Sequence, residues 1–182
     1  MIRKLTLLLS LLALYAYSQD SKKFIPGYVV FANGDSLKGL VANLHKNSHE
    51  YIDFKPSFSN KDTMLMPKDL KSYKIGDKQY FTIAFPGTED GQKILHFAEV
   101  LVKGNLTLYK SKLKTDPILP PTEAYIVKKV GIDSSFAVGK VKFLLPLIED
   151  EVEVAEIIKT HKYKENEADK IRICQLYNEK RK

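Results

Sequence analysis

The sequence predicts an α+β fold in which about eight to ten short strands, paired mostly as antiparallel β hairpins in a sheet or a partly open barrel, precede two C-terminal helices. Residues 24–145 alternate apolar runs, rich in aromatic and β-branched side chains, with turns of Gly, Asn and Asp. After Pro146 the spacing of apolar residues changes to three and four, which is typical of helices. We therefore expect one globular domain at residues 19–182, which is β-rich over residues 24–145 and helical over residues 147–180.

The N-terminus has the features of a secretory signal peptide. Two basic residues precede an apolar run at residues 5–16, which is shorter than the roughly 20 residues that a membrane-spanning helix needs. Ala16 and Ser18 supply the small side chains that signal peptidase selects. We therefore predict that residues 1–18 are removed on export to the periplasm or the exterior, and that the processed chain has no membrane span. An uncleaved anchor or a buried core helix is the alternative interpretation.

The dipeptide Asn33-Gly34 separates two apolar runs and is the first strong hairpin signal. Asn-Gly favours a type I′ turn, because both central residues of that turn need a positive φ. A two-residue turn at this position predicts that Val30 pairs with Leu37.

Two more hairpins follow from their turn residues. Gly76-Asp77 predicts a hairpin that sets Tyr73 opposite Tyr80, a favourable aromatic cross-strand pair. Lys103-Gly104-Asn105 predicts a third. The predicted strands are residues 28–32, 37–41, 51–54, 63–66, 72–75, 78–82, 97–102, 106–109, 125–129 and 141–145.

The C-terminal region carries two helix patterns. The first has its acidic residues early and a lysine late, which complements the helix dipole. The second begins at Asn166, a favourable N-cap, and places Ile171, Cys174 and Tyr177 on one face. The predicted helices are residues 147–161 and 166–180.

The charge balance argues against nucleic-acid binding. The chain has 29 Lys and Arg against 22 Asp and Glu, a formal net charge of +7. Only three of the basic residues are Arg, the side chain best suited to bidentate recognition of phosphates and bases. The lysines also alternate with acids along the chain. We therefore interpret them as solvated surface and expect no nucleic-acid partner.

One short segment could hold a metal ion. His45, His49 and Glu50 lie within six residues, and two imidazoles with a carboxylate are ordinary ligands of divalent metals. The segment lies between two predicted strands and contains Asn47-Ser48, so a surface loop is the favoured interpretation. We therefore assign no metal ligand, and the three residues define an alternative function, a small periplasmic metal-dependent hydrolase.

No other grouping of residues indicates chemistry. The sequence contains no Gly-x-Ser-x-Gly, no His-Glu-x-x-His and no Gly-x-Gly-x-x-Gly. Its single cysteine, Cys174, excludes a disulfide framework and is expected to be a buried apolar side chain rather than a nucleophile. The 10 Tyr and 9 Phe fit either a core or a sugar-binding platform. No catalytic residue and no cofactor is assigned.

Several turns and strands form a recognisable series, at residues 26–30, 34–40, 100–109, 140–145, 163–164 and 176–178. Together they resemble a group of small secreted β-rich proteins of unknown function from Bacteroidota. The resemblance implies fold and lineage and supplies no active site, because its motifs are structural. It extends over most of the chain after the predicted signal peptide.

The leading hypothesis is therefore an exported, non-enzymatic module that binds a cell-envelope protein, glycan or surface. It rests on the signal peptide, the strand-rich pattern and the lack of a catalytic grouping. The alternative is the metal-dependent hydrolase using His45, His49 and Glu50. A third hypothesis is a membrane-surface protein attracted through its lysines.

Overall fold

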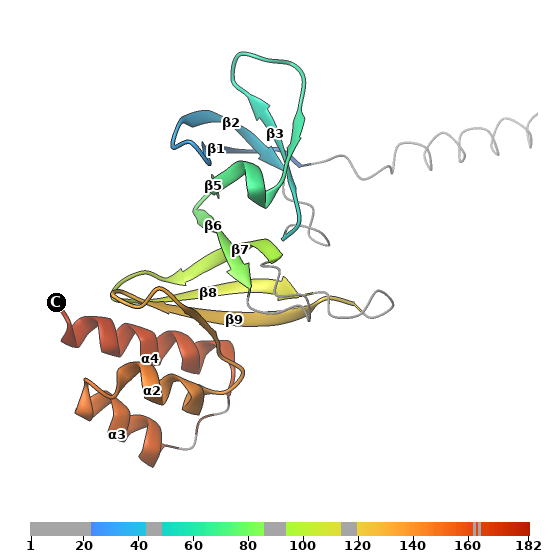
Figure 1. Cartoon of the computed structure of the whole chain (residues 1–182). Coiled ribbons are helices and arrows are strands. Elements are labelled where there is room, and N and C mark those ends of the chain that lie inside the picture. Colours follow the sequence, from blue (N-terminus) through green and yellow to red (C-terminus); the bar gives the residue numbers. More distant parts are fainter. Residues whose placement is uncertain (1–22, 43–48, 86–93, 114–119, 162, 164) are drawn as a thin grey trace, which may run out of the picture.

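The computed structural model describes residues 23–42, 49–85, 94–113, 120–161, 163 and 165–182. Ten strands form one antiparallel sheet in the order β10-β9-β8-β7-β6-β5-β1-β2-β3-β4, and helices follow it (Figure 1). The predicted α+β class is confirmed, and the sheet is open, with β10 and β4 as its two edges.

The strands are β1 (Ile25–Phe31), β2 (Ser36–Ala42), β3 (Ile52–Pro56), β4 (Thr63–Leu65), β5 (Leu70–Ile75), β6 (Lys78–Phe85), β7 (Ile94–Val102), β8 (Leu106–Leu113), β9 (Thr122–Lys129) and β10 (Ser135–Ala137). The 3-10 helices are η1 (Pro67–Asp69) and η2 (Val141–Leu144). The α-helices are α2 (Leu145–Ile148), α3 (Val152–Thr160) and α4 (Glu167–Lys180).

The second and third predicted hairpins are confirmed. Gly76 has a φ of +56°, as its place in the β5–β6 turn requires. Tyr73 pairs with Tyr80, and the two rings stack with centroids 4.6 Å apart. β7 and β8 form the next hairpin, in which a bulge between Val100 and Val102 shifts the register.

The predicted register of the first hairpin is wrong by one residue, because Leu37 pairs with Val29 rather than with its neighbour Val30. Only Gly34 has a positive φ in this turn, +99°. The carbonyl of Phe31 accepts from the N–H of Gly34, and the N–H of Phe31 donates to the carbonyl of Asp35. The turn is therefore a three-residue loop that ends in a left-handed glycine.

Residues 141–145, predicted as a strand, are helical and form η2 and the first residue of α2. Val141 and Leu144 are both fully buried, and residues three apart share one side only in a helical conformation. Pro146 lies in the first turn of α2, where a missing N–H is tolerated. The last strand of the sheet is β10 instead, which pairs with β9.

The helix predicted at residues 147–161 is divided into α2 and α3. Asp150, between the two, accepts hydrogen bonds from Lys129 Nζ at 2.8 Å, from the Tyr177 hydroxyl at 3.0 Å and from Arg181 Nη2 at 2.6 Å. These bonds fix the segment between α2 and α3 against β9 and the C-terminal end of α4. The chain therefore turns at Asp150, where the spacing of apolar residues predicted a single helix.

The predicted start of α4 is confirmed. The side chain of Asn166 accepts from the backbone N–H of Asp169 at 2.9 Å. Cys174 is buried as expected, but the apolar face is displaced, because Ile173 is fully buried whereas Ile171 is only partly buried.

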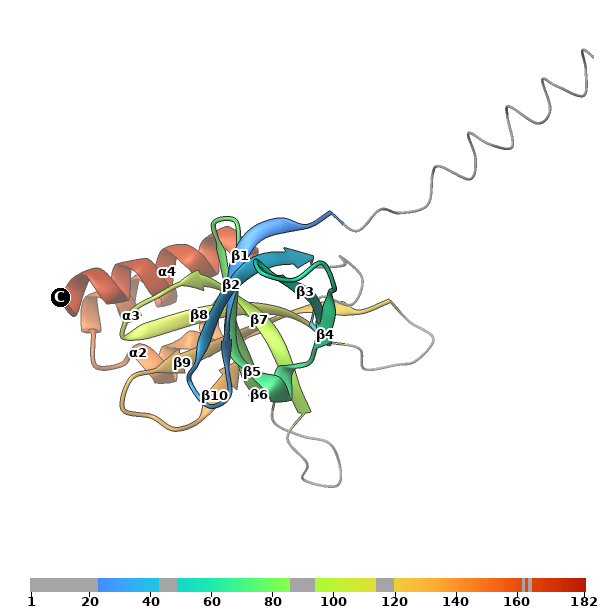
Figure 2. The ribbon, with the colours of Figure 1, turned by 90° about the horizontal axis from the view of Figure 1, so that it is seen from above.

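Two hydrophobic cores stabilise the sheet at its two ends. The first, which we call the strand core, is formed by Val29, Val41, Ile52, Phe54, Leu70, Tyr73 and Phe97. The second, the helix core, joins β7, β8 and β9 to the helices. Figures 1 and 2 agree in placing α2, α3 and α4 beside β8 and β9, away from β3 and β4. The buried residues of the helix core are Val102, Leu106, Leu108, Val127, Val138, Val141, Leu144, Leu147, Ile148, Val154, Ile158, Ile173, Cys174 and Tyr177.

Beside the helix core, the side chain of Asn178 in α4 bonds to the backbone of β8 as a neighbouring strand would. Asn178 Oδ1 accepts from the N–H of Leu106 at 2.8 Å, and Asn178 Nδ2 donates to the Leu106 carbonyl at 2.9 Å. Leu106 is fully buried, so these bonds satisfy backbone groups that water does not reach. Gly104 leaves room for these bonds, because a Cβ at that position would lie 2.5 Å from the Asn178 side chain and would displace it.

No helix in the described part of the chain is long and apolar enough to cross a bilayer. The signal peptide predicted at residues 1–18 lies outside the described residues and stays a prediction.

We expect Asn178→Ala to lower the free energy of unfolding by about 1–3 kcal/mol, because it leaves both backbone groups of Leu106 buried and unpaired. Chemical denaturation measures the loss. Glu179→Ala, at an exposed position of the same helix, is the control and should change stability by less than about 0.5 kcal/mol. Similar losses in both variants would contradict the role assigned to Asn178.

Candidate functional site

One row of directly paired residues crosses seven strands of the sheet. Residues opposite each other in a ladder point to the same side, so the whole row shares one face. The row is apolar at its β2 end and becomes polar at β6 and beyond. We call it the central row: Leu37, Val29, Tyr73, Tyr80, Glu99, Lys110 and Tyr125.

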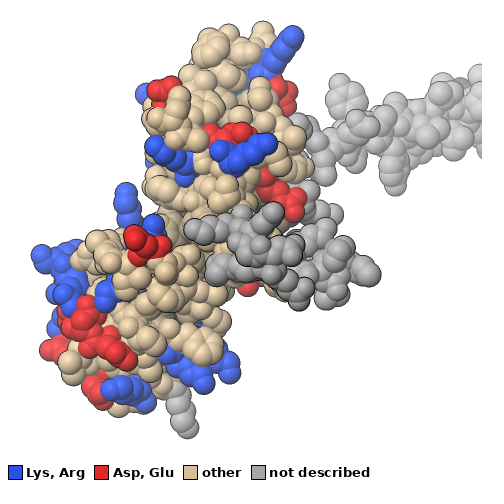
Figure 3. Space-filling view, in the orientation of Figure 1, with Lys and Arg blue, Asp and Glu red and all other residues tan. Residues whose placement is uncertain are grey.

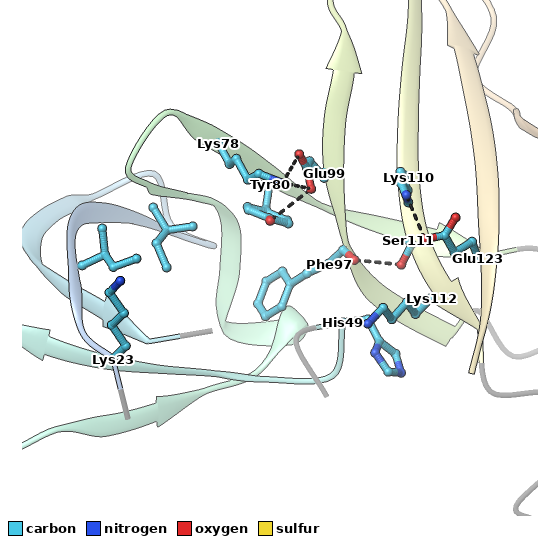
Figure 4. Close-up of a pocket in the computed structure, with 12 residues that line it drawn as sticks. Lys23, His49, Lys78, Tyr80, Phe97, Glu99, Lys110, Ser111, Lys112 and Glu123 are labelled. Atoms are coloured by element: carbon cyan, nitrogen blue, oxygen red, sulfur yellow. Dashed lines mark hydrogen bonds and ion pairs between the residues drawn. The ribbon is translucent and has the colours of Figure 1, made fainter. Parts of the chain in front are cut away.

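A groove of about 450 Å³ opens over the middle of the central row, between the two cores (Figure 4). Figure 3 shows the molecular surface narrowing between the strand end and the helix end, with lysines and carboxylates at the constriction. β1, β5, β6, β7, β8 and β9 all contribute side chains to the groove. Its lining is Lys23, Ile25, His49, Ile75, Lys78, Tyr80, Phe97, Glu99, Lys110, Ser111, Lys112 and Glu123.

The apolar part of the lining continues the strand core. Tyr73 stacks on one face of the Tyr80 ring, with 5° between the planes, and packs edge-to-face against Phe97 at 4.9 Å. Ile25 and Ile75 extend this apolar surface toward the β1 end. The aromatic residues are therefore held by ring contacts as well as by the strand register.

Hydrogen bonds fix the polar side chains on the β6–β7 side. Lys78 Nζ lies 2.9 Å from Glu99 Oε1, and the Tyr80 hydroxyl donates to Glu99 Oε2 at 3.2 Å. Burial, together with the Glu99 carboxylate, raises the pKa of Tyr80 well above its ordinary value. Tyr80 is therefore a neutral hydrogen-bond donor at any physiological pH.

A second polar cluster joins the groove to α4. Lys110 Nζ lies 2.8 Å from Glu123 Oε1 and 2.8 Å from Glu167 Oε2. Burial lowers the pKa of Lys110, but the hydrogen bonds to Glu123 and Glu167 outweigh it and raise the pKa above its ordinary value. The bond to Lys110 lowers the pKa of each carboxyl group. All three groups are therefore charged near neutral pH.

His49 lies where β7 and β8 separate. Among the described residues, the ladder between these strands covers only Glu99 to Val102 of β7. Beyond it, the N–H of Phe97 donates to the carbonyl of His49 at 2.9 Å, and the carbonyl of Phe97 accepts from Ser111 Oγ at 2.8 Å. The His49 segment thus occupies the gap between the strands and fixes Phe97 in the groove.

His49 is paired with a second histidine that sequence analysis did not connect to it. The rings of His49 and His96 are stacked, with centroids 5.4 Å apart, and Phe85 packs against His96 at 5.2 Å. Both imidazoles are buried, at 2% and 9% exposure. Burial and the neighbouring His49 lower the pKa of His96, against a smaller opposing effect of Glu50.

The structure brings together only part of the metal site considered from the sequence. His49 Nε2 is 3.4 Å from Glu50 Oε1. His45 lies outside the described residues, and within those residues no cluster of three or more His, Cys, Asp or Glu could hold a metal ion. The metal-dependent hydrolase therefore stays a hypothesis that depends on His45.

Cys174 is fully buried in the helix core, as the helical spacing predicted. Burial raises the pKa of its thiol to about 12. The thiol is therefore protonated at neutral pH and poorly suited to act as a nucleophile.

Only one part of the groove could be predicted from the sequence. The predicted pairing of Tyr73 with Tyr80 is the start of the central row. Its continuation to Glu99 and Lys110 depends on the β6–β7 register. The residues between these strands contain turn dipeptides, Pro86-Gly87 and Asp90-Gly91, but the segment is too long for a turn type to fix which residues pair. His96 also carries no local pattern, because its partner comes from a different part of the chain.

Comparison of the chain with protein-family models, with curated proteins and with solved structures found no match. Its function is therefore inferred from the geometry of the groove.

We expect the buried histidine pair to make stability depend on pH. Since folding lowers the pKa of His96 below its ordinary value of 6.5, the unfolded chain binds a proton that the folded chain does not. This contribution to stability is present above about pH 6.5 and is lost as the pH falls toward the folded-state pKa.

His96→Phe should therefore show a smaller loss of unfolding free energy between about pH 7.5 and 5 than the wild type, in urea denaturation followed by circular dichroism. His161→Phe replaces an exposed histidine and should keep the wild-type pH dependence. A wild-type slope in His96→Phe would show that His96 does not couple folding to protonation.

Proposed function

We propose that this chain is an exported, non-enzymatic module that binds a cell-envelope ligand in the groove over the central row. The observation that carries the proposal is the groove itself, about 450 Å³ in volume, with an apolar floor and a charged rim. Ligand sites generally have this volume and this combination of apolar lining with a few placed polar groups.

The rigidity of the groove supports a binding role. Its walls come from neighbouring strands of one sheet, and the Lys78–Glu99 and Lys110–Glu123 ion pairs link side chains of adjacent walls. A preformed site loses little conformational entropy when a ligand enters it.

The predicted signal peptide at residues 1–18 and the resemblance to small secreted proteins of Bacteroidota support a location in the periplasm or outside the cell. A cell-envelope protein, a glycan or another surface component is then the available ligand. Nucleic acid is not proposed, because after the signal peptide the chain retains only Arg172 and Arg181 as arginines.

A thermal-shift screen against envelope glycans, envelope proteins, lipids and divalent metals tests the proposal. A ligand present at a hundred times its Kd adds ~2.7 kcal/mol of stability, which corresponds to roughly 5–10 °C for a chain of this size. We expect Lys78→Glu to reduce the shift, because it places a carboxylate beside Glu99 at the rim of the groove.

Lys159→Glu is a matched control. Both lysines are more than half exposed and each pairs with one glutamate, but Lys159 lies on α3, and its partner is Glu156. Equal shifts in both variants would place the binding site elsewhere. A zinc or manganese shift that is lost in His45→Ala would instead favour the metal-dependent hydrolase.

A further inference from the structure

Resting on the proposed function, we infer that the ligand of the groove is an acidic oligosaccharide. In this arrangement a sugar ring packs on Tyr80, its hydroxyl groups bond to the carboxylates of the groove, and its acidic groups lie near Lys23 and Lys112. Three features of the lining support this ligand class: the exposed side of one aromatic ring, the mixture of donors and acceptors, and the excess of lysine.

The first feature is the orientation of Tyr80. Tyr73 covers one face of the ring, and Tyr80 is only partly buried and contributes to the lining of the groove. The Tyr80 hydroxyl is bonded to Glu99, which fixes the ring. The C–H groups of a pyranose pack well against such a ring, because the ring face carries partial negative charge and the C–H groups partial positive charge.

The second feature is the mixture of hydrogen-bonding groups around the ring. Glu99 and Glu123 are acceptors, whereas the lysines of the lining are donors. A sugar hydroxyl both donates and accepts, so adjacent hydroxyls can use both kinds of group. A fatty chain could not use these charged groups and would leave them desolvated, which is costly.

The third feature is the charge of the lining. The lining holds four lysines and two glutamates, and a third glutamate, Glu167 of α4, also pairs with Lys110. Four lysines therefore face three glutamates, and Lys23 makes no ion pair with another described residue. Figure 4 shows Lys23 at one end of the groove, with Lys110 and Lys112 toward the other and the aromatic residues between them. Lysines at both ends of the groove, one more in number than the glutamates around it, complement a chain of acidic sugars better than a neutral sugar or a single acidic monosaccharide.

The probes that test this inference are trimers of uronic acids and their methyl esters, in which a methyl group on each carboxyl removes its negative charge and leaves the sugar chain unchanged. Isothermal titration calorimetry on the purified protein should show that at least one acid, from a panel of galacturonate, mannuronate and glucuronate trimers, binds about tenfold or more tightly than its ester, a difference of ~1.4 kcal/mol. Its affinity should fall as salt concentration rises.

Variants in the groove show whether the binding site is the one inferred. Lys23→Gln and Lys112→Gln should each weaken binding of the acid more than binding of the ester. Tyr80→Leu should lower the affinity for both the acid and the ester by about tenfold. Tyr80→Phe keeps the aromatic ring and should lower the affinity less. Lys159→Gln on α3 is the control for a charge change away from the groove. Circular dichroism and thermal unfolding establish that each variant is folded.

Binding of an ester as tight as that of its acid would overturn the acidic class, as would the absence of binding by every acid in the panel. If Lys23→Gln and Tyr80→Leu both bind the acid with wild-type affinity, the oligosaccharide does not bind in the groove. The proposed function would survive these outcomes if another envelope component gives a thermal shift that Lys78→Glu reduces and Lys159→Glu does not.

Discussion

The pairing of β5 with β6 is the constraint on which the rest of the structure depends. It sets Tyr73 against Tyr80, with the rings 4.6 Å apart, and so joins the strand core to the polar half of the central row. Because side chains alternate between the two faces of a strand, a slip of one residue would turn Tyr80 to the other face. The register of β6 with β7 then places Glu99 beside Tyr80, and the register of β7 with β8 places Lys110 beside Glu99.

The groove follows from the way in which this open sheet is covered. At one end β1, β2, β3 and β5 pack their own side chains into the strand core, and at the other α2, α3 and α4 cover β8 and β9. Among the described residues, neither the strand core nor the three helices extend over the middle of the central row. The side chains there are stabilised by ion pairs with one another, which keeps lysines and glutamates ordered beside Tyr80 and Phe97.

The sequence predicted most features that depend on local chemistry and missed those that depend on distant contacts. The exception is the turn at Asn33-Gly34, where a three-residue loop shifts the predicted register by one residue. Glycine-containing turns predicted the β5–β6 and β7–β8 hairpins, and Asn166 predicted the start of α4. The run at residues 141–145 was predicted as a strand because a short apolar run fits either conformation. Its helical form is explained by the burial of Val141 and Leu144 together. The division between α2 and α3 depends on Asp150 bonding to Lys129, Tyr177 and Arg181, and no periodicity reports such contacts.

Photo-crosslinking in the producing cells tests the central claim, that the groove is the ligand-binding surface, and it does not require that the ligand be identified first. A benzophenone amino acid at position 78 lies at the rim of the groove, and the same residue at position 159 lies on α3 at similar exposure. The account predicts a discrete adduct, with protein or glycan, from position 78 and none from position 159. Equal adducts from both positions, or an adduct only from position 159, would contradict it.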